Sequence, residues 1–245
     1  KSEYWYFVAY FALFFFTPFL NILAEKLEKV QFKKLIITIV ILFSLVPTFL
    51  FSDIANINYG YTPLWLAALY LIGAYIKKYS VKKSIKFCII SFISCAAGTW
   101  AFRFITSLVT TKIFGAPKFA TIFYNYTSPT ILLSAVMLLL LFSQLKFSQV
   151  VNKIISIAAP LAFSVYIIHN EPHVMKYFIK GTMVDLVSLN PVVFLLSILG
   201  IAISIYIICS LIDFLRFYLF KILKIKELCI KIENFIAKKA GRLFE

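Results

Sequence analysis

Seven runs of mostly apolar residues dominate the sequence, and most of the lysines lie in the segments between and after them. A bilayer core of about 30 Å needs about 20 such residues in a helix, and interfacial residues beside the shorter runs can extend them. The runs occupy residues 4–24, 35–52, 62–76, 85–102, 127–142, 154–169 and 192–215. Apolar residues make up 62% of the 245 residues and charged residues 14%, and a soluble globule cannot bury so much apolar surface. We therefore predict an all-α fold, a polytopic transmembrane helical bundle of about seven spans.

The distribution of basic residues predicts the orientation of the chain. If the seven runs alternate across the membrane, 19 of the 25 lysines and arginines lie on one side and 6 on the other. Positive charge marks the cytoplasmic side of a membrane protein. We therefore expect the N-terminus of this chain outside and its C-terminus in the cytoplasm. Because the lysines serve topology in this arrangement, the net charge of +15 does not indicate a nucleic-acid partner.

Residues 216–245 follow the last run and contain no further span. Leu228, Ile232 and Phe235 recur at helical spacing, with lysines elsewhere around the helix. We predict a transmembrane bundle at residues 1–215, followed at 216–245 by a cytoplasmic basic amphipathic tail that lies on the membrane lipids. A solvated helix or a frayed terminus is the alternative for the tail.

The densest polar cluster is the stretch from His169 to His173, at the outer end of the sixth run, and it contains both histidines of the chain. An imidazole exchanges protons near neutral pH, and the carboxylate of Glu171 could orient the imidazole of His169. The alternative is a turn in which Pro172 ends the helix and His169 satisfies a backbone carbonyl. The spacing matches no zinc-binding pattern, so we expect no metal.

Three residues near the outer ends of runs are candidates for substrate binding. Arg103 could hold a phosphate, a carboxylate or a polar glycan with its planar guanidinium, although snorkelling to lipid headgroups explains it as well. Trp5 and Tyr10 could form a platform on which a sugar stacks, or they belong to an aromatic belt at the interface. Farther along the chain, Asp213 and Arg216 are predicted to form a local i,i+3 ion pair.

Five short motifs occur in order along the chain. They are Trp5-Tyr6-Phe7-Val8-Ala9-Tyr10 with Pro18-Phe19-Leu20-Asn21, the stretch Tyr70 to Ile76 followed by Lys77 and Lys78, Ser128-Pro129, the stretch Val165 to Pro172, and Ile212-Asp213-Phe214-Leu215-Arg216. Together they resemble the membrane-bound acyltransferase 3 family, the polytopic O-acyltransferases of bacterial surface polysaccharides. The resemblance spans nearly the whole chain.

The resemblance implies an enzyme of the bacterial cytoplasmic membrane with about ten spans. Such an enzyme moves an acyl group, usually acetyl from acetyl-CoA, to a hydroxyl of a polysaccharide or lipid-linked glycan of the cell envelope or capsule. Acyl-CoA is then a donor substrate, and no bound cofactor is expected. The alternatives from the residues alone are a transporter or flippase of a lipid-linked glycan and a non-catalytic membrane subunit.

The resemblance also bears on the site residues. Family members carry their main catalytic histidine and arginine in their first spans, which have no counterpart after Lys1. We therefore expect the chain to be the C-terminal two-thirds of such an enzyme, truncated at the N-terminus, without the catalytic histidine and inactive alone. His169 and Glu171 are then the candidates for an accessory catalytic role, and Arg103, Trp5 and Tyr10 for substrate binding.

Overall fold

The computed structural model describes residues 4–119 and 121–241, with side chains placed as far as Phe235. Within these ranges every regular element is helical, which confirms the all-α prediction. The α-helices are α1 (Trp5–Lys26), α2 (Lys29–Val40), α3 (Val46–Phe49), α4 (Pro63–Lys78), α5 (Ile85–Phe114), α6 (Pro129–Phe142), α7 (Gln149–His169), α8 (Pro172–Val174), α9 (Pro191–Ile222) and α10 (Ile225–Gly241). The other helical turns are the π-helical η1 (Ile41–Leu45) and η4 (Met175–Ile179) and the 3-10 helical η2 (Asn58–Gly60), η3 (Ile122–Tyr124) and η5 (Asp185–Ser188).

In the described ranges, six helical segments are long and apolar enough to cross a membrane. They are Trp5–Lys26, Lys29–Phe49, Ile85–Phe114, Ile122–Phe142, Gln149–His169 and Pro191–Ile222. The remaining predicted span is α4, whose 16 residues reach only about 24 Å along the helix axis. The chain is thus a multi-pass, all-helical membrane protein with six candidate spans. Its orientation and the membrane in which it resides stay predictions.

Two helices continue past the ends predicted for them. The apolar run in α5 ends near residue 102, but the helix stops only where Gly115 takes a left-handed φ of 71°. In α9 the helix passes through Asp213 and Arg216, and Arg216 Nε donates to Asp213 Oδ1 at 2.7 Å, which confirms the predicted ion pair. Because arginine and lysine favour helices, a charged residue ends an apolar run without ending the helix.

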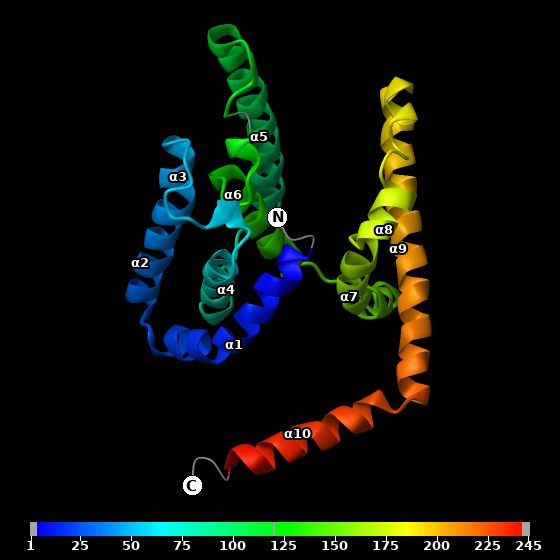
Figure 1. The fold of residues 1–245 in the computed structure, drawn as a ribbon. Helices are drawn as coiled ribbons and strands as arrows, with labels where there is room; N and C mark the ends of the chain where they lie inside the picture. Colours follow the sequence, from blue (N-terminus) through cyan, green and yellow to red (C-terminus); the bar gives the residue numbers. More distant parts are fainter. Residues whose placement is uncertain (1–3, 120, 242–245) are drawn as a thin grey trace. The chain divides into compact units, whose positions relative to one another are not determined.

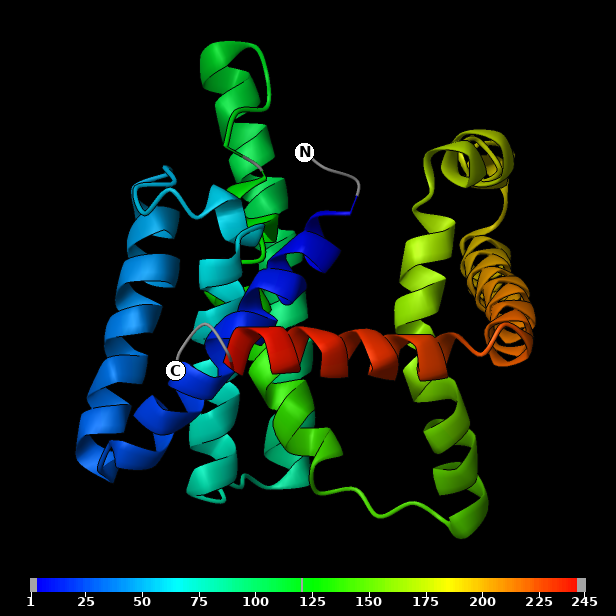
Figure 2. The same ribbon diagram turned by 60° about the horizontal axis from the view of Figure 1, so that its bottom comes forward.

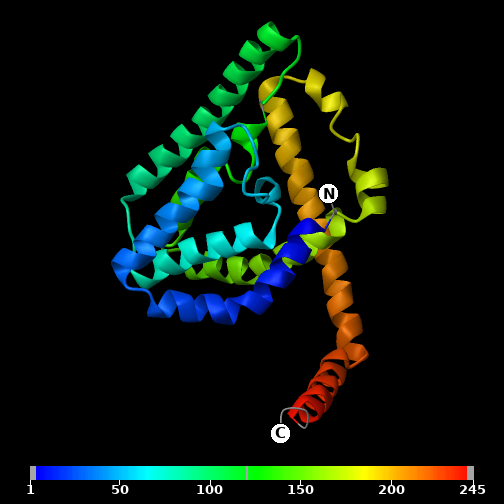
Figure 3. The ribbon, with the colours of Figure 1, turned by 60° about the vertical axis from the view of Figure 1, so that its left-hand side comes forward.

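The chain divides into two compact units after Lys146. The first unit, residues 1–146, contains α1 to α6, and the second unit, residues 147–245, contains α7 to α10. In the first unit α5 packs along α6, and α4 packs against both α1 and α2 (Figures 1 and 2). Figure 3 shows α1 running along α4. In the second unit α7 packs against α9, and the boundary predicted at residue 215 falls inside α9.

α4 lies at the centre of the core of the first unit. Its residues Trp65, Ala68, Leu71 and Ile72 are buried, at the spacing that places apolar side chains along one side of a helix. Phe32 of α2 is fully buried in the same cluster. This packing holds α4 between its neighbours and so fixes the position of the polar side chains on the rest of its surface.

Replacing Gly60 with alanine is expected to destabilise the first unit. Gly60 has φ +98°, and an alanine Cβ would lie 2.7 Å from Tyr126 Cβ and 3.0 Å from Trp65 Cδ1. The strained backbone and the steric overlap together cost about 2–4 kcal/mol, so the thermal unfolding midpoint in detergent should fall. Gly73→Ala is the matched control, because Gly73 lies within a helix and its added Cβ meets nothing within 4 Å. Equal midpoints for the two variants would contradict this prediction.

Candidate functional site

Two of the sequence motifs meet between α1 and α4. The hydroxyl of Tyr70 on α4 donates to Oδ1 of Asn21 on α1 at 2.6 Å. These residues border a pocket of about 610 Å³, here called the α1–α4 pocket, and the other residues that line it are Ala24, Glu25, Gly73, Ala74, Lys77 and Lys78. Its volume lies within the range of about 300–1,000 Å³ that is typical of small-molecule sites.

The spacing of residues on α4 explains how this pocket forms. Tyr70, Gly73 and Lys77 follow one another at intervals of three and four residues, so they share one face of the helix. A Cβ added to Gly73 would meet nothing within 4 Å, so the space above this glycine is open. The pocket therefore has an unfilled middle, with the hydrogen-bonded Asn21 and Tyr70 toward one end and lysines toward the other.

Lys78 ties the two helices together at the lysine end of the α1–α4 pocket. Its ammonium group donates to the carbonyl oxygens of Ala24, Glu25 and Leu27 at 2.8, 2.9 and 2.9 Å. Carbonyls at the C-terminus of a helix lack partners within the helix and carry partial negative charge. Because the three ammonium protons serve these three carbonyls, Lys78 is structural. Lys77, which is exposed, is the second cation that lines the pocket.

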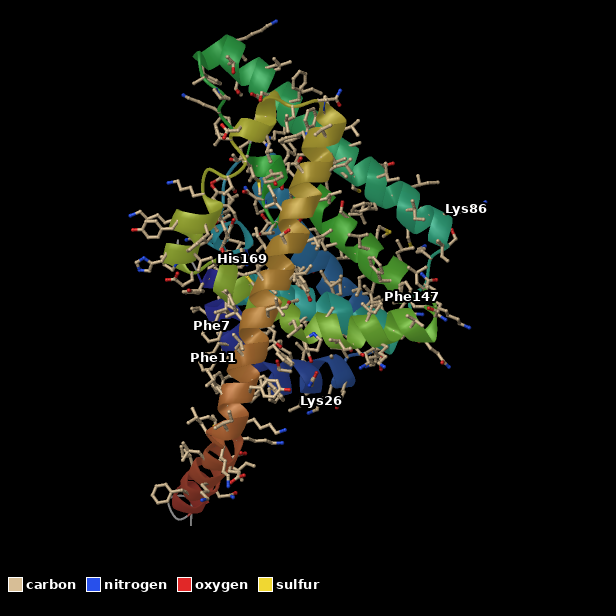
Figure 4. All side chains as sticks on the ribbon, turned by 90° about the vertical axis from the view of Figure 1, so that its right-hand side faces the viewer. Phe7, Phe11, Lys26, Lys86, Phe147 and His169 are labelled. Atoms are coloured by element: carbon tan, nitrogen blue, oxygen red, sulfur yellow. The ribbon has the colours of Figure 1, made fainter. Side chains whose placement is uncertain are left out.

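His169 is the last residue of α7, in the second unit (Figure 4). Its Nδ1 lies 2.7 Å from the carbonyl oxygen of Val165. A carbonyl only accepts, so we assign the proton to Nδ1. Its Nε2 lies 2.9 Å from Nδ2 of Asn170, an amide that also donates to the Tyr166 carbonyl at 2.9 Å. Nε2 therefore carries the lone pair, which is the form of imidazole that a general base needs.

Glu171 caps the short helix α8 that follows. Its Oε2 accepts a hydrogen bond from the backbone N–H of Val174 at 2.8 Å, and Pro172 occupies the first helical position. Glutamate followed by proline is a favourable start for a helix, because the carboxylate meets an unpaired N–H and proline has none to lose. The Val165 carbonyl and Asn170, rather than Glu171, orient the imidazole of His169. The catalytic roles of both residues stay predictions.

Trp5 and Tyr10 lie on the first turns of α1, in the first unit. The ring of Trp5 contacts Tyr61 edge-on, with 4.5 Å between the ring centroids, and Tyr126 at 5.5 Å. Tyr10 is half-exposed and stacks on Tyr6 at 6.1 Å. Neither Tyr61 nor Tyr126 belongs to one of the sequence motifs, although both come shortly before a proline that begins a helix. Trp5 is thus one member of an aromatic group drawn from three separate segments of the chain.

Arg103 lies on α5, also in the first unit. Its guanidinium lies over the ring of Tyr124, 5.4 Å from the centroid. With Trp100, Phe104 and Ser107 it lines a hollow of about 280 Å³. A planar cation above an exposed aromatic ring is compatible both with a ligand contact and with an interfacial anchor, and its assignment to substrate binding stays a prediction.

The candidate residues thus fall into separate groups within the two units. Arg103, Trp5 and Tyr10 belong to the first unit, as does the α1–α4 pocket, and His169 and Glu171 belong to the second. Among the described residues, no three histidine, cysteine, aspartate or glutamate side chains gather as a metal ion would require.

Comparison with known proteins identifies the family. A family model described as an acyltransferase domain matches residues 2–211, which include the α1–α4 pocket and the His169 segment. No match was found among curated proteins or among solved structures. Because the matched range covers most of the 245 residues, the chain belongs to the acyltransferase 3 family.

Proposed function

We propose that this protein is an O-acyltransferase that moves an acyl group, most simply acetyl, from acyl-CoA to a hydroxyl of a cell-envelope or exported polysaccharide. The observation that carries the proposal is the α1–α4 pocket, which is lined by residues of two motifs and lies within the range that matches the acyltransferase domain. Acyltransferases need an acyl donor, and this pocket has the size of a small-molecule site. The proposed location of the protein is the cytoplasmic membrane of a bacterium, with the lysine-rich ends of the helices facing the cytoplasm.

The chemistry of the pocket suits the donor. Coenzyme A is polyanionic at its nucleotide end and uncharged along the arm that carries the thioester. Lys77 is exposed at one end of the pocket, and the segments after α1 and α4 bring further lysines. Such a field attracts phosphate groups and raises their local concentration. The open space above Gly73 would then receive the uncharged arm of the donor.

The transfer itself needs a base and an acceptor. In the proposed reaction a base removes the proton of a sugar hydroxyl, and the oxygen attacks the acyl carbonyl carbon, either on the thioester itself or after the acyl group has passed to a carrier group. A carbon–oxygen bond forms, the carbon–sulfur bond breaks, and the departing thiolate takes up a proton to give free coenzyme A. We assign an accessory part in the proton transfer to Nε2 of His169, within the segment that Glu171 caps, and binding of the glycan to Arg103, Trp5 and Tyr10.

The test is acyl transfer by the complete gene product in membranes. With acetyl-CoA and the polysaccharide of the source organism, we expect release of free thiol that depends on the polysaccharide, and ester-linked acetyl groups on the glycan. A transporter or flippase of a lipid-linked glycan would move its substrate across the membrane without releasing thiol. Glycan movement without thiol release would therefore overturn the proposal.

A further inference from the structure

We propose that a cleft between α2, α4 and α6 in the first unit binds an acyl chain of an anionic phospholipid, with Lys83 beside the lipid phosphate. The cleft, called the lipid cleft below, has a volume of about 430 Å³. It is separate from the α1–α4 pocket, and no residue that the structure describes lines both. The inference does not depend on the proposed acyltransferase reaction.

One face of α6 forms the long wall of the lipid cleft. Its lining residues are Pro129, Leu132, Leu133, Val136, Met137 and Leu140. These positions repeat every three or four residues, so they form a single apolar stripe. From the first to the last of them the helix rises about 16 Å, close to half of a bilayer core of about 30 Å. The cleft thus has the length of the hydrocarbon layer of one leaflet.

The opposite walls are also apolar. Ile36 and Val40 line the cleft from α2, and Ile72 and Ile76 line it from α4. In a membrane protein, lipid tails rather than water surround an apolar cleft of this kind. An acyl chain can fill it without any unpaired polar group, because nearly all of its lining makes no hydrogen bonds.

Among the described residues, Lys83 is the single charged one that lines the cleft. It follows Val81, which packs against the cluster of Cys88, Met137 and Leu140, so we place Lys83 at the Leu140 end of the cleft. Lys83 is exposed, and its ammonium lies 5.8 Å from the centroid of the Phe87 ring. A cation at the end of an apolar cleft about one leaflet deep matches a phosphate attached to an acyl chain.

The surrounding charge favours an anionic lipid over a zwitterionic one. Residues 77–88 contain five lysines and no aspartate or glutamate, and Lys86 stands at the start of α5 (Figure 4). A lysine beside the headgroup of an anionic lipid strengthens lipid binding about fivefold, and a lysine farther from the headgroup contributes less because salt screens its charge. The same absence of acids in this segment disfavours a partner helix with basic residues at this end.

The experiment measures the phospholipid retained by the purified complete protein, by native mass spectrometry after exchange into detergent with either phosphatidylglycerol or phosphatidylcholine. We expect about one bound phosphatidylglycerol per protein and several-fold less phosphatidylcholine. Lys83→Gln should reduce the preference about fivefold, whereas Lys82→Gln, which removes a neighbouring lysine that does not line the cleft, should leave most of it. Equal retention of the two lipids by the unsubstituted protein would overturn the proposal.

A second pair of variants tests the cleft itself. Leu133 lines the cleft and is 44% exposed, and Leu139, on the same helix, does not line it and is 48% exposed. Leu133→Trp should fill the cleft and lower phosphatidylglycerol retention at least fivefold, while Leu139→Trp leaves it unchanged. If Leu133→Trp retains the lipid, or if it changes the oligomeric state of the protein instead, the cleft holds no acyl chain and the proposal fails.

Discussion

Gly73→Leu in the complete gene product is expected to abolish most acyl transfer while the protein stays folded. The added Cβ meets nothing within 4 Å, so the leucine side chain extends into the α1–α4 pocket instead of into packed protein. Glycine in the interior of a helix is less favourable than leucine by somewhat under 1 kcal/mol, so the substitution should not lower helix stability. We expect kcat/KM for acetyl-CoA to fall at least tenfold, a loss of about 1.4 kcal/mol in transition-state stabilisation.

The control for Gly73→Leu is Gly200→Leu. Gly200 also lies within a helix, α9, and a Cβ added to it also meets nothing within 4 Å, but it lines none of the pockets described above. Both variants are assayed for thiol release at equal expression and compared in thermal unfolding. A smaller effect is expected for Gly73→Ala, because a methyl group occupies little of the pocket. Normal kcat/KM for a well-folded Gly73→Leu protein would place the donor elsewhere.

The fold was predictable wherever an apolar run alone decides the structure. Backbone N–H and carbonyl groups that lie in lipid must find hydrogen-bond partners within the chain, so each long apolar run becomes a helix. The ends of the helices were less predictable, because charged residues such as Arg103 and Arg216 end an apolar run but continue a helix. The third run gave a helix too short to count as a span, since α4 ends after 16 residues, shortly before Ser80 takes a left-handed φ of 46°.

The candidate site was predictable only where its contacts are local. His169 reaches a carbonyl four residues earlier, a contact that helix geometry offers to a side chain with a hydrogen-bond donor at this position, and it is the alternative stated above for this residue. Asn21 and Tyr70 are 49 residues apart, and their hydrogen bond exists because α1 packs on α4. No pattern within either motif predicts that contact, so the α1–α4 pocket could not be derived from the sequence.

His169→Ala in the complete gene product is expected to lower kcat for acyl transfer about a hundredfold, the lower end of what a general acid or base contributes. The hydrogen bonds leave the proton on Nδ1 and the lone pair on Nε2, and this lone pair accepts a hydrogen bond from the Asn170 amide. A sugar hydroxyl that displaces the Asn170 amide would meet a nitrogen able to accept its proton. The KM for acetyl-CoA should stay unchanged, because the donor is assigned to the α1–α4 pocket. His173→Ala is the control, since His173 is exposed and stacks on Tyr177.

His169→Gln separates this chemical role from a structural one. Glutamine keeps an N–H group that can donate to the Val165 carbonyl, but its amide cannot accept a proton as an imidazole does. If His169 only satisfies that carbonyl at the end of α7, the glutamine variant should recover both the unfolding midpoint and the acyl transfer that alanine loses. If His169 acts as a base, glutamine should recover the midpoint alone. Full activity of His169→Gln would therefore remove His169 from the reaction and leave it as a residue that ends a helix.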